Sequence, residues 1–151
     1  MTDTIRCFVI REGHLLLGLI QTGSYRGQYT GFAGALQPNE EQPDAVRRIL
    51  WSQATIKARH PLPAGTLIVH RNDREDERII VYRVDEFEGQ PHGAEGLATV
   101  WYTISQPLPY RLMSEDAPFW LPYLLRHRYF RGELWLGGKG RLVRHDIKTL
   151  P

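Results

Sequence analysis

The segment from Gly31 to Ala58 constrains the fold more than any other part of the chain, because its pattern predicts a short strand, a loop and one amphipathic helix. Pro43 favours a helix start, since the first helical position needs no partner for a backbone N–H. Asp44 then lies in the first turn, where the positive end of the helix dipole favours a carboxylate. Apolar residues at three- and four-residue spacing form one predicted buried stripe of Val46, Ile49, Leu50 and Ala54. Trp51 lies off this stripe.

The remainder of the chain alternates between strand-like runs and connections that carry glycine or proline. Strands are predicted at 4–11, 14–20, 65–71, 79–85 and 98–104, and a closing hairpin at 132–147. Loops are predicted at 21–30, 59–63, 72–78 and 86–97. A second helix is predicted between a cap at Ser114 and Phe130, where apolar residues recur at helical spacing. Several strands with two helices predict an α+β fold, an α/β/α sandwich around a mixed sheet.

Length and charge are those of an ordinary globular protein. At 151 residues with 42% hydrophobic content, the chain is expected to form a single domain over residues 1–151. Its 19 basic and 17 acidic residues leave a charge of +2, too weak to predict binding to nucleic acid or an anionic membrane. No stretch approaches the roughly 20 apolar residues of a membrane span, so we expect a soluble, cytoplasmic protein. The single cysteine, Cys7, lies in an apolar run that predicts a buried thiol.

The central segment resembles the signature of the Nudix family, G-x5-E-x7-R-E-U-x-E-E-x-G-U, in which U is a bulky aliphatic residue. The matching positions are Gly34, Glu40, Arg48, Leu50 and Ile56. Three signature glutamates, which in that family hold a divalent metal against a diphosphate, fall on Ile49, Ser52 and Gln53, and the signature glycine falls on Thr55. None of the three replacements carries the negative charge that Mg²⁺ prefers. The resemblance implies a Nudix-like mixed β-sheet flanked by helices, with a degenerate signature.

Other segments are similar to the branch of the Nudix family that hydrolyses oxidised purine nucleoside triphosphates. They are LLLGL at 15–19, GQYTGFAGALQ at 27–37, ERIIVYRVDEFEG at 77–89 and WLPYLLRHRYFRGELWL at 120–136. The resemblance places the asparagine that touches the base on Thr30 and the stacking tryptophan on Ser114. It places two adjacent aspartates on Asp116 and Ala117, and a loop glutamate on Gly96, next to Glu95. The expected ligand-binding residues are Thr30, Gly34, Ser114 and Asp116 from the resemblance, together with Arg6.

Arg6 lies on the same strand face as Phe8 and Ile10, which is unusual for a charged residue. The simpler interpretation is an arginine near a strand end, with a buried stem and a head in solvent. The alternative is an anion contact inside a pocket. Asp116 has two interpretations of equal weight, a favourable charge at a helix start or a contact to the ligand.

Glu40 and Arg48 are the only catalytic candidates in the signature, although in the family this pair chiefly braces the loop against the helix. Glu40 and Glu95 are the candidate metal ligands. No cofactor is otherwise expected. The spacing of the six histidines and the lone cysteine predicts no zinc site.

Three functions remain open. The first is a degenerate Nudix protein that lacks metal-dependent pyrophosphate hydrolysis and keeps a pocket for a nucleotide-like or other small molecule. The second is a hydrolase of nucleoside diphosphate derivatives, modified purine triphosphates included, whose Mg²⁺ ligands have moved to Glu40, Glu41, Glu95 or the loop Glu75–Glu77. The third is a protein-interaction module whose pocket is filled by core side chains. The sequence pattern does not specify an oligomeric state.

Overall fold

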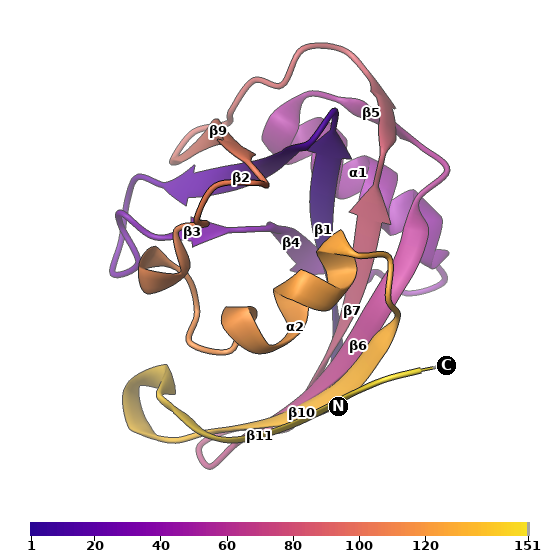
Figure 1. Cartoon of the computed structure of the whole chain (residues 1–151). Coiled ribbons are helices and arrows are strands. Elements are labelled where there is room, and N and C mark those ends of the chain that lie inside the picture. The colour runs from indigo at the N-terminus through magenta and orange to yellow at the C-terminus, as the bar shows by residue number, and fades with distance from the viewer. Residues whose placement is uncertain (151) are drawn as a thin grey trace.

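A computed structural model describes residues 1–150, in which one large sheet carries a helix on each face (Figure 1). The first part of the chain forms β1 (Thr2–Arg11), β2 (His14–Ile20), β3 (Tyr29–Thr30), β4 (Phe32–Ala35) and α1 (Gln42–Ala54). The middle forms β5 (Lys57–Arg59), β6 (Leu62–Arg71), β7 (Glu77–Val84), β8 (Glu86–Glu88) and β9 (Leu97–Thr103). The last part forms the short helix η1 (Tyr110–Leu112), α2 (Ala117–Leu125), β10 (Phe130–Leu136), η2 (Gly138–Gly140) and β11 (Leu142–Thr149).

The large sheet is mixed and has the order β11-β10-β6-β7-β1-β2-β3, with β4 also paired to β1 and β9 to β2. Strand β1 runs parallel to β7, and β10 runs parallel to β6, while the other pairs in this sheet are antiparallel. At the predicted turn between β1 and β2, Glu12 and Gly13 take φ angles of 51° and 76°. Two positive φ angles are the type I′ geometry that suits the twist of a hairpin. The predicted α+β fold is confirmed.

Two hydrophobic cores lie on opposite faces of the sheet, and alternate residues of β1 contribute to both. Ile5, Cys7 and Val9 belong to the core that packs under α1. Phe8 and Ile10 belong to the core under α2. Arg6, which lies between Ile5 and Cys7, therefore faces the α2 side. The predicted burial of Cys7 is confirmed, and burial raises the pKa of its thiol.

The predicted second helix is wrong at both ends. Asp116, not Ser114, precedes the first turn of α2, and the helix ends at Leu125 instead of continuing to Phe130. His127 takes a left-handed φ of 56°, while the Arg128 N–H donates to the Tyr123 carbonyl and the His127 N–H to the Leu124 carbonyl. This pattern is the Schellman motif, which satisfies the last carbonyls of a helix and turns the chain away from it.

The short pair β5–β8 also corrects the sequence analysis, which predicts loops at 59–63 and 86–97. Lys57, Ala58 and Arg59 pair with Glu88, Phe87 and Glu86 in an antiparallel register. Each strand has only three residues and one buried side chain, so it leaves no alternating pattern long enough to detect.

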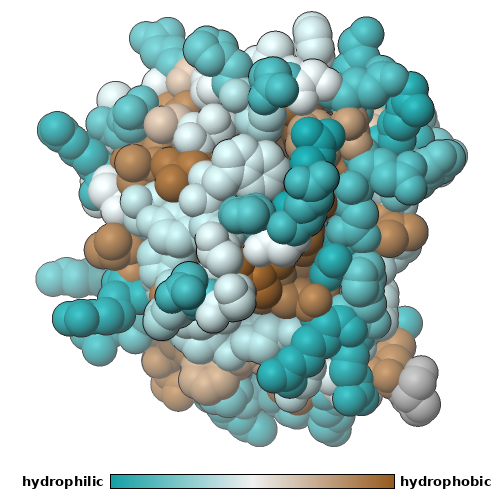
Figure 2. All heavy atoms as spheres, turned by 45° about the horizontal axis from the view of Figure 1, so that its top comes forward, coloured by the Kyte–Doolittle hydropathy of each residue, from teal (hydrophilic) through white to brown (hydrophobic). Residues whose placement is uncertain are grey.

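Exposed apolar side chains are scattered over the surface. Figure 2 shows one face, on which brown apolar areas are small and separated by polar residues. Trp51 on α1 is 54% exposed, as its position off the buried stripe predicts. Within residues 1–150, no helix has the length and apolar character needed to cross a membrane.

Candidate functional site: the signature helix and the cavity under α2

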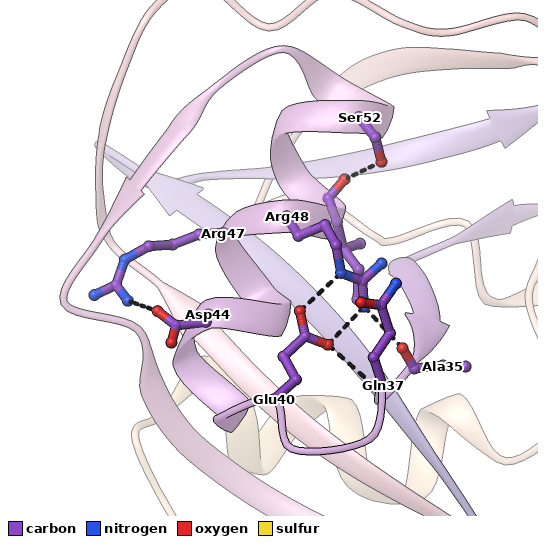
Figure 3. A network of polar contacts seen from close by, with 8 residues as sticks. Ala35, Gln37, Glu40, Asp44, Arg47, Arg48 and Ser52 are labelled. Atoms are coloured by element: carbon purple, nitrogen blue, oxygen red, sulfur yellow. Dashed lines mark hydrogen bonds and ion pairs between the residues drawn. The ribbon is translucent and has the colours of Figure 1, made fainter.

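The signature segment is held together by Glu40 and Arg48, which form the predicted brace between loop and helix (Figure 3). The Arg48 Nε donates to Glu40 Oε2 at 2.9 Å, and its Nη2 donates to Oε1 at 3.0 Å. The same Nη2 donates to the carbonyl of Ala35 at 2.8 Å, and the Gln37 N–H donates to Glu40 Oε1 at 3.1 Å. The hydrogen bonds from Arg48 lower the pKa of Glu40. Both carboxylate oxygens of Glu40 are therefore engaged within the protein.

The three positions that carry glutamate in the Nudix signature make structural contacts instead. Ile49 is 1% exposed and packs against Gly34, where an added Cβ would lie 3.0 Å from the Ile49 side chain. Gln53 Nε2 donates to the Ala33 carbonyl at 2.7 Å. Ser52 Oγ donates to the Ile49 carbonyl at 3.1 Å. Ile49 is thus the extra core residue that the helix periodicity predicts.

The side chains near α1 do not fit the divalent ion that the resemblance implies. Over the part of the chain that the structure describes, no three His, Cys, Asp or Glu side chains are grouped closely enough to hold a metal ion. Glu40 is committed to Arg48, and Glu41 and Glu95 are exposed at the surface. A hard cation needs several carboxylate or carbonyl oxygens at one point, and these residues do not supply them.

A cavity of about 1150 Å³ lies on the opposite face of the sheet, under α2. Its walls come from β1, β3, β6 and β10, from the segment that leads into α2, and from the η2 turn. Arg6, Thr30, Ser114 and Asp116 all line it, so the structure brings four of the five expected ligand-binding residues together. Gly34 is not among the lining residues and packs against Ile49.

Arg6 corrects the simpler sequence interpretation, because it is only partly exposed and lines the cavity instead of lying at a strand end. It lies within β1, paired with Ala33 of β4 and Val81 of β7. Its Nε is buried without a hydrogen-bond partner among the described residues. Burial lowers the pKa of Arg6, and the charges of Asp116 and Glu77 offset part of that effect. The group nevertheless stays protonated, as arginine does in proteins.

Asp116 is buried at the start of α2, and its Oδ2 accepts a hydrogen bond from Trp120 Nε1 at 2.7 Å. Its carboxylate makes no capping hydrogen bond to the helix. Asp116 therefore lines the cavity and does not cap the helix through its side chain. Trp120 in turn packs edge-on against Phe8, with ring centroids 5.5 Å apart, and forms an aromatic wall.

Sequence reasoning missed Arg71 and Trp120 as cavity residues. Arg71 lies two residues after Val69 on β6, and both line the cavity. The period of two in a strand was the available signal, but it does not show which face will be covered by a helix. Trp120 was visible only as one apolar residue in a helical pattern.

Several known proteins resemble this chain in sequence or in fold. No protein-family profile matches the chain. A Danio rerio protein named oxidized purine nucleoside triphosphate hydrolase is 26% identical over 141 residues, which cover 92% of this chain and 89% of that protein. The mMutator MutT protein of Bacillus halodurans superposes with a TM-score of 0.82 at 18% identity, over 98% of each chain. The E. coli ORF135 protein gives a TM-score of 0.71 at 20% identity, over 83% of this chain and 89% of that one. The chain therefore has the MutT-like Nudix fold.

Proposed function

We propose that the chain is a divergent member of the Nudix family that takes a nucleotide-like small molecule into the cavity under α2. The observation that carries the proposal is the cavity itself, into which Arg6, Thr30 and Asp116 project polar groups between aromatic walls. Pockets for small molecules combine apolar walls with a few converging polar groups in this way. The similarity to a purine nucleotide hydrolase over 92% of the chain supports the nucleotide-like character of the ligand.

The helix α1 supports binding without the metal-dependent chemistry that the Nudix signature implies. A magnesium ion polarises a phosphoryl oxygen and activates water when carboxylates hold it in place. Here Ile49 is buried in the core, and Gln53 and Ser52 donate to backbone carbonyls. We infer that this helix is neutral on the face where the signature requires charge.

The second candidate is a hydrolase, and the comparisons favour it over binding alone, since the similar Danio rerio protein is named as a hydrolase. This candidate needs metal ligands at new positions, drawn from Glu40, Glu41, Glu95 or the loop Glu75–Glu77. Glu77 already accepts hydrogen bonds from Thr4 Oγ1 at 2.6 Å and Arg71 Nη1 at 2.9 Å. The cavity also argues against the third function, a protein-interaction module, because core side chains do not fill the pocket.

One experiment separates the two candidates. Thermal denaturation is measured against nucleoside triphosphates, nucleotide sugars and dinucleoside diphosphates, each with and without Mg²⁺, and formation of the nucleoside monophosphate product is measured in parallel. A ligand at one hundred times its dissociation constant stabilises the fold by about 2.7 kcal/mol, which raises Tm by roughly 5–11 °C in a domain of this size. Metal-independent stabilisation without turnover supports binding. Turnover that needs Mg²⁺ overturns it and supports the hydrolase.

For the hydrolase candidate, replacement of its carboxylates provides the control. Turnover that survives the combined variant Glu40→Gln, Glu41→Gln and Glu95→Gln, and separately Glu75→Gln with Glu77→Gln, would exclude relocated ligands. Absence of stabilisation by every compound in the panel would overturn the proposal of a nucleotide-like ligand.

A further inference from the structure

Arg6 differs from the other arginines that point into the protein. Arg83 is 8% exposed, and it donates to Asp85 and to the carbonyls of Leu124 and Leu125. Arg71 donates to Glu77 at 2.9 Å. Within residues 1–150, Arg6 has no such partner, and its Nε is inaccessible and unsatisfied. The Arg6 side chain is only partly exposed, and the cavity reaches it.

The carboxylates nearest to Arg6 are engaged by other groups. Asp116 Oδ2 accepts from Trp120 Nε1, and the two oxygens of Glu77 accept from Thr4 and Arg71. Asp116 and Glu77 act on Arg6 through charge, without contacting it as hydrogen-bond acceptors. An unpaired buried charge costs free energy, so proteins normally pair such groups or leave them for a ligand.

The surroundings of Arg6 restrict the shape of that ligand. Phe8 and Trp120 supply aromatic walls, and Ile79 and Leu134 supply aliphatic ones. The guanidinium is a planar fork of N–H donors that matches two oxygens of one anionic group. Flat rings pack well against aromatic side chains.

We propose that Arg6 is the anion-binding residue of the cavity, and that the ligand carries an oxyanion with two acceptor oxygens on a flat ring that lies against the aromatic wall formed by Phe8 and Trp120. This inference rests on the proposed use of the cavity for a small molecule and names the chemical class that the cavity selects. The oxyanion is a carboxylate or a phosphate. The anion takes the place of the hydrogen-bond partner that Arg6 lacks within the protein, so the positive charge of Arg6 is retained for the ligand at the expense of stability.

The test uses three probes of matched ring size: 2-naphthoate, 2-naphthamide and 2-naphthyl phosphate. Binding is measured by calorimetric titration of the full chain, without added metal. We expect 2-naphthoate or 2-naphthyl phosphate to bind and the neutral amide to bind at least tenfold more weakly. Preference for one of the two anions identifies the source of the oxyanion. Equal binding of the amide would overturn the proposal.

Three variants locate the anion contact. Arg6→Met keeps the length of the side chain and removes its charge, and it should weaken the preferred anion by about 10- to 100-fold, the range expected for hydrogen bonds to a charged group. Arg6→Lys should restore only part of the affinity, because an ammonium lacks the planar fork. Arg47→Met is the matched control, since Arg47 is exposed and pairs with Asp44 on α1. It should bind as the unmodified chain does.

A structural role for Arg6 predicts a different outcome. Without bound anion, Arg6→Met should leave Tm unchanged or raise it, because the variant removes an inaccessible Nε that has no hydrogen-bond partner. A Tm lowered by more than 5 °C together with unchanged anion affinity would overturn the proposal. The failures of the two proposals are distinguishable: nucleotides that bind Arg6→Met as well as the original chain support the cavity ligand but overturn the role of Arg6. Arg6-dependent naphthoate binding without any nucleotide binding supports the role of Arg6 alone.

Discussion

Restoring the signature glutamate at position 49 should destabilise the protein, because Ile49 is part of the core under α1. The Ile49→Glu substitution removes a side chain that is 1% exposed, whose burial contributes about 1.5–3 kcal/mol. Holding a carboxyl with an ordinary pKa of about 4.3 in its neutral form at pH 7 costs about 4 kcal/mol more. Rotation toward the exposed Ser52 offsets part of this cost. We expect a loss of about 4 kcal/mol, or a decrease in Tm of roughly 8–16 °C.

Thermal denaturation at pH 7 and pH 5 measures this loss. The decrease should be smaller at pH 5, where the neutral carboxyl is closer to its ordinary state. Ile49→Val should cost about 1 kcal/mol, and Ser52→Glu should change stability by less than about 0.5 kcal/mol because Ser52 is exposed. An Ile49→Glu variant as stable as Ser52→Glu would refute the core assignment and show that this helix face is open to a metal ion.

The remaining predictions concern single contacts. Stability should fall as pH drops below about 4.5, because burial raises the pKa of Glu77 but the hydrogen bonds from Thr4 and Arg71 lower it by more, so the folded-state pKa lies below the ordinary one. The stability that Glu77 contributes is complete above its ordinary pKa and is lost as pH falls through its folded-state pKa. Glu77→Gln should flatten this pH dependence in an acid titration followed by circular dichroism. Thr55→Gly should stabilise the fold by about 1 kcal/mol in urea denaturation. Thr55 takes a φ of 57°, a conformation that costs a β-branched residue about 1–2 kcal/mol. The hydrogen bond that its side chain donates to the His92 carbonyl is exposed, so losing that bond costs little. Gly65→Ala should destabilise by about 1–3 kcal/mol in the same assay, because its Cβ would lie 2.5 Å from the Phe130 ring; no measurable loss would mean that the ring moves freely.

The sequence predicts the signature region well because its signals are local. Helix periodicity identifies Ile49 and Leu50 as buried and Trp51 as exposed, and all three are confirmed. The alternation in β1 likewise assigns Ile5, Cys7 and Val9 to one face. Short-range signals fail where backbone conformation decides the outcome. The end of α2 depends on His127 in a left-handed conformation, for which histidine is a weak predictor compared with glycine.

The environment of Arg6 could not be predicted because it depends on segments that are distant in sequence. Alternation shows that Arg6 shares a face with Phe8, but α2 and β10, more than one hundred residues later, decide whether that face is open to solvent. The partners of Glu77 are also set by tertiary structure, since Thr4 and Glu77 are 73 residues apart. Sequence alone therefore names the charged residue but not whether it is paired.

Gln53, which replaces a signature glutamate, and Arg6, which lies outside the signature, meet at Ala33 of β4. Gln53 donates to the carbonyl of Ala33, and Ala33 is the residue that pairs with Arg6 across β1 and β4. In a metal-dependent site, acidic side chains hold a cation, and the cation neutralises the ligand. Here the α1 side lacks the acidic groups, and the α2 side supplies a fixed positive charge of its own. Binding of an anionic ligand should then be unaffected by a chelator and weakened about 10- to 100-fold in Arg6→Met. An affinity that falls when a chelator is added would instead show that a metal ion supplies the positive charge.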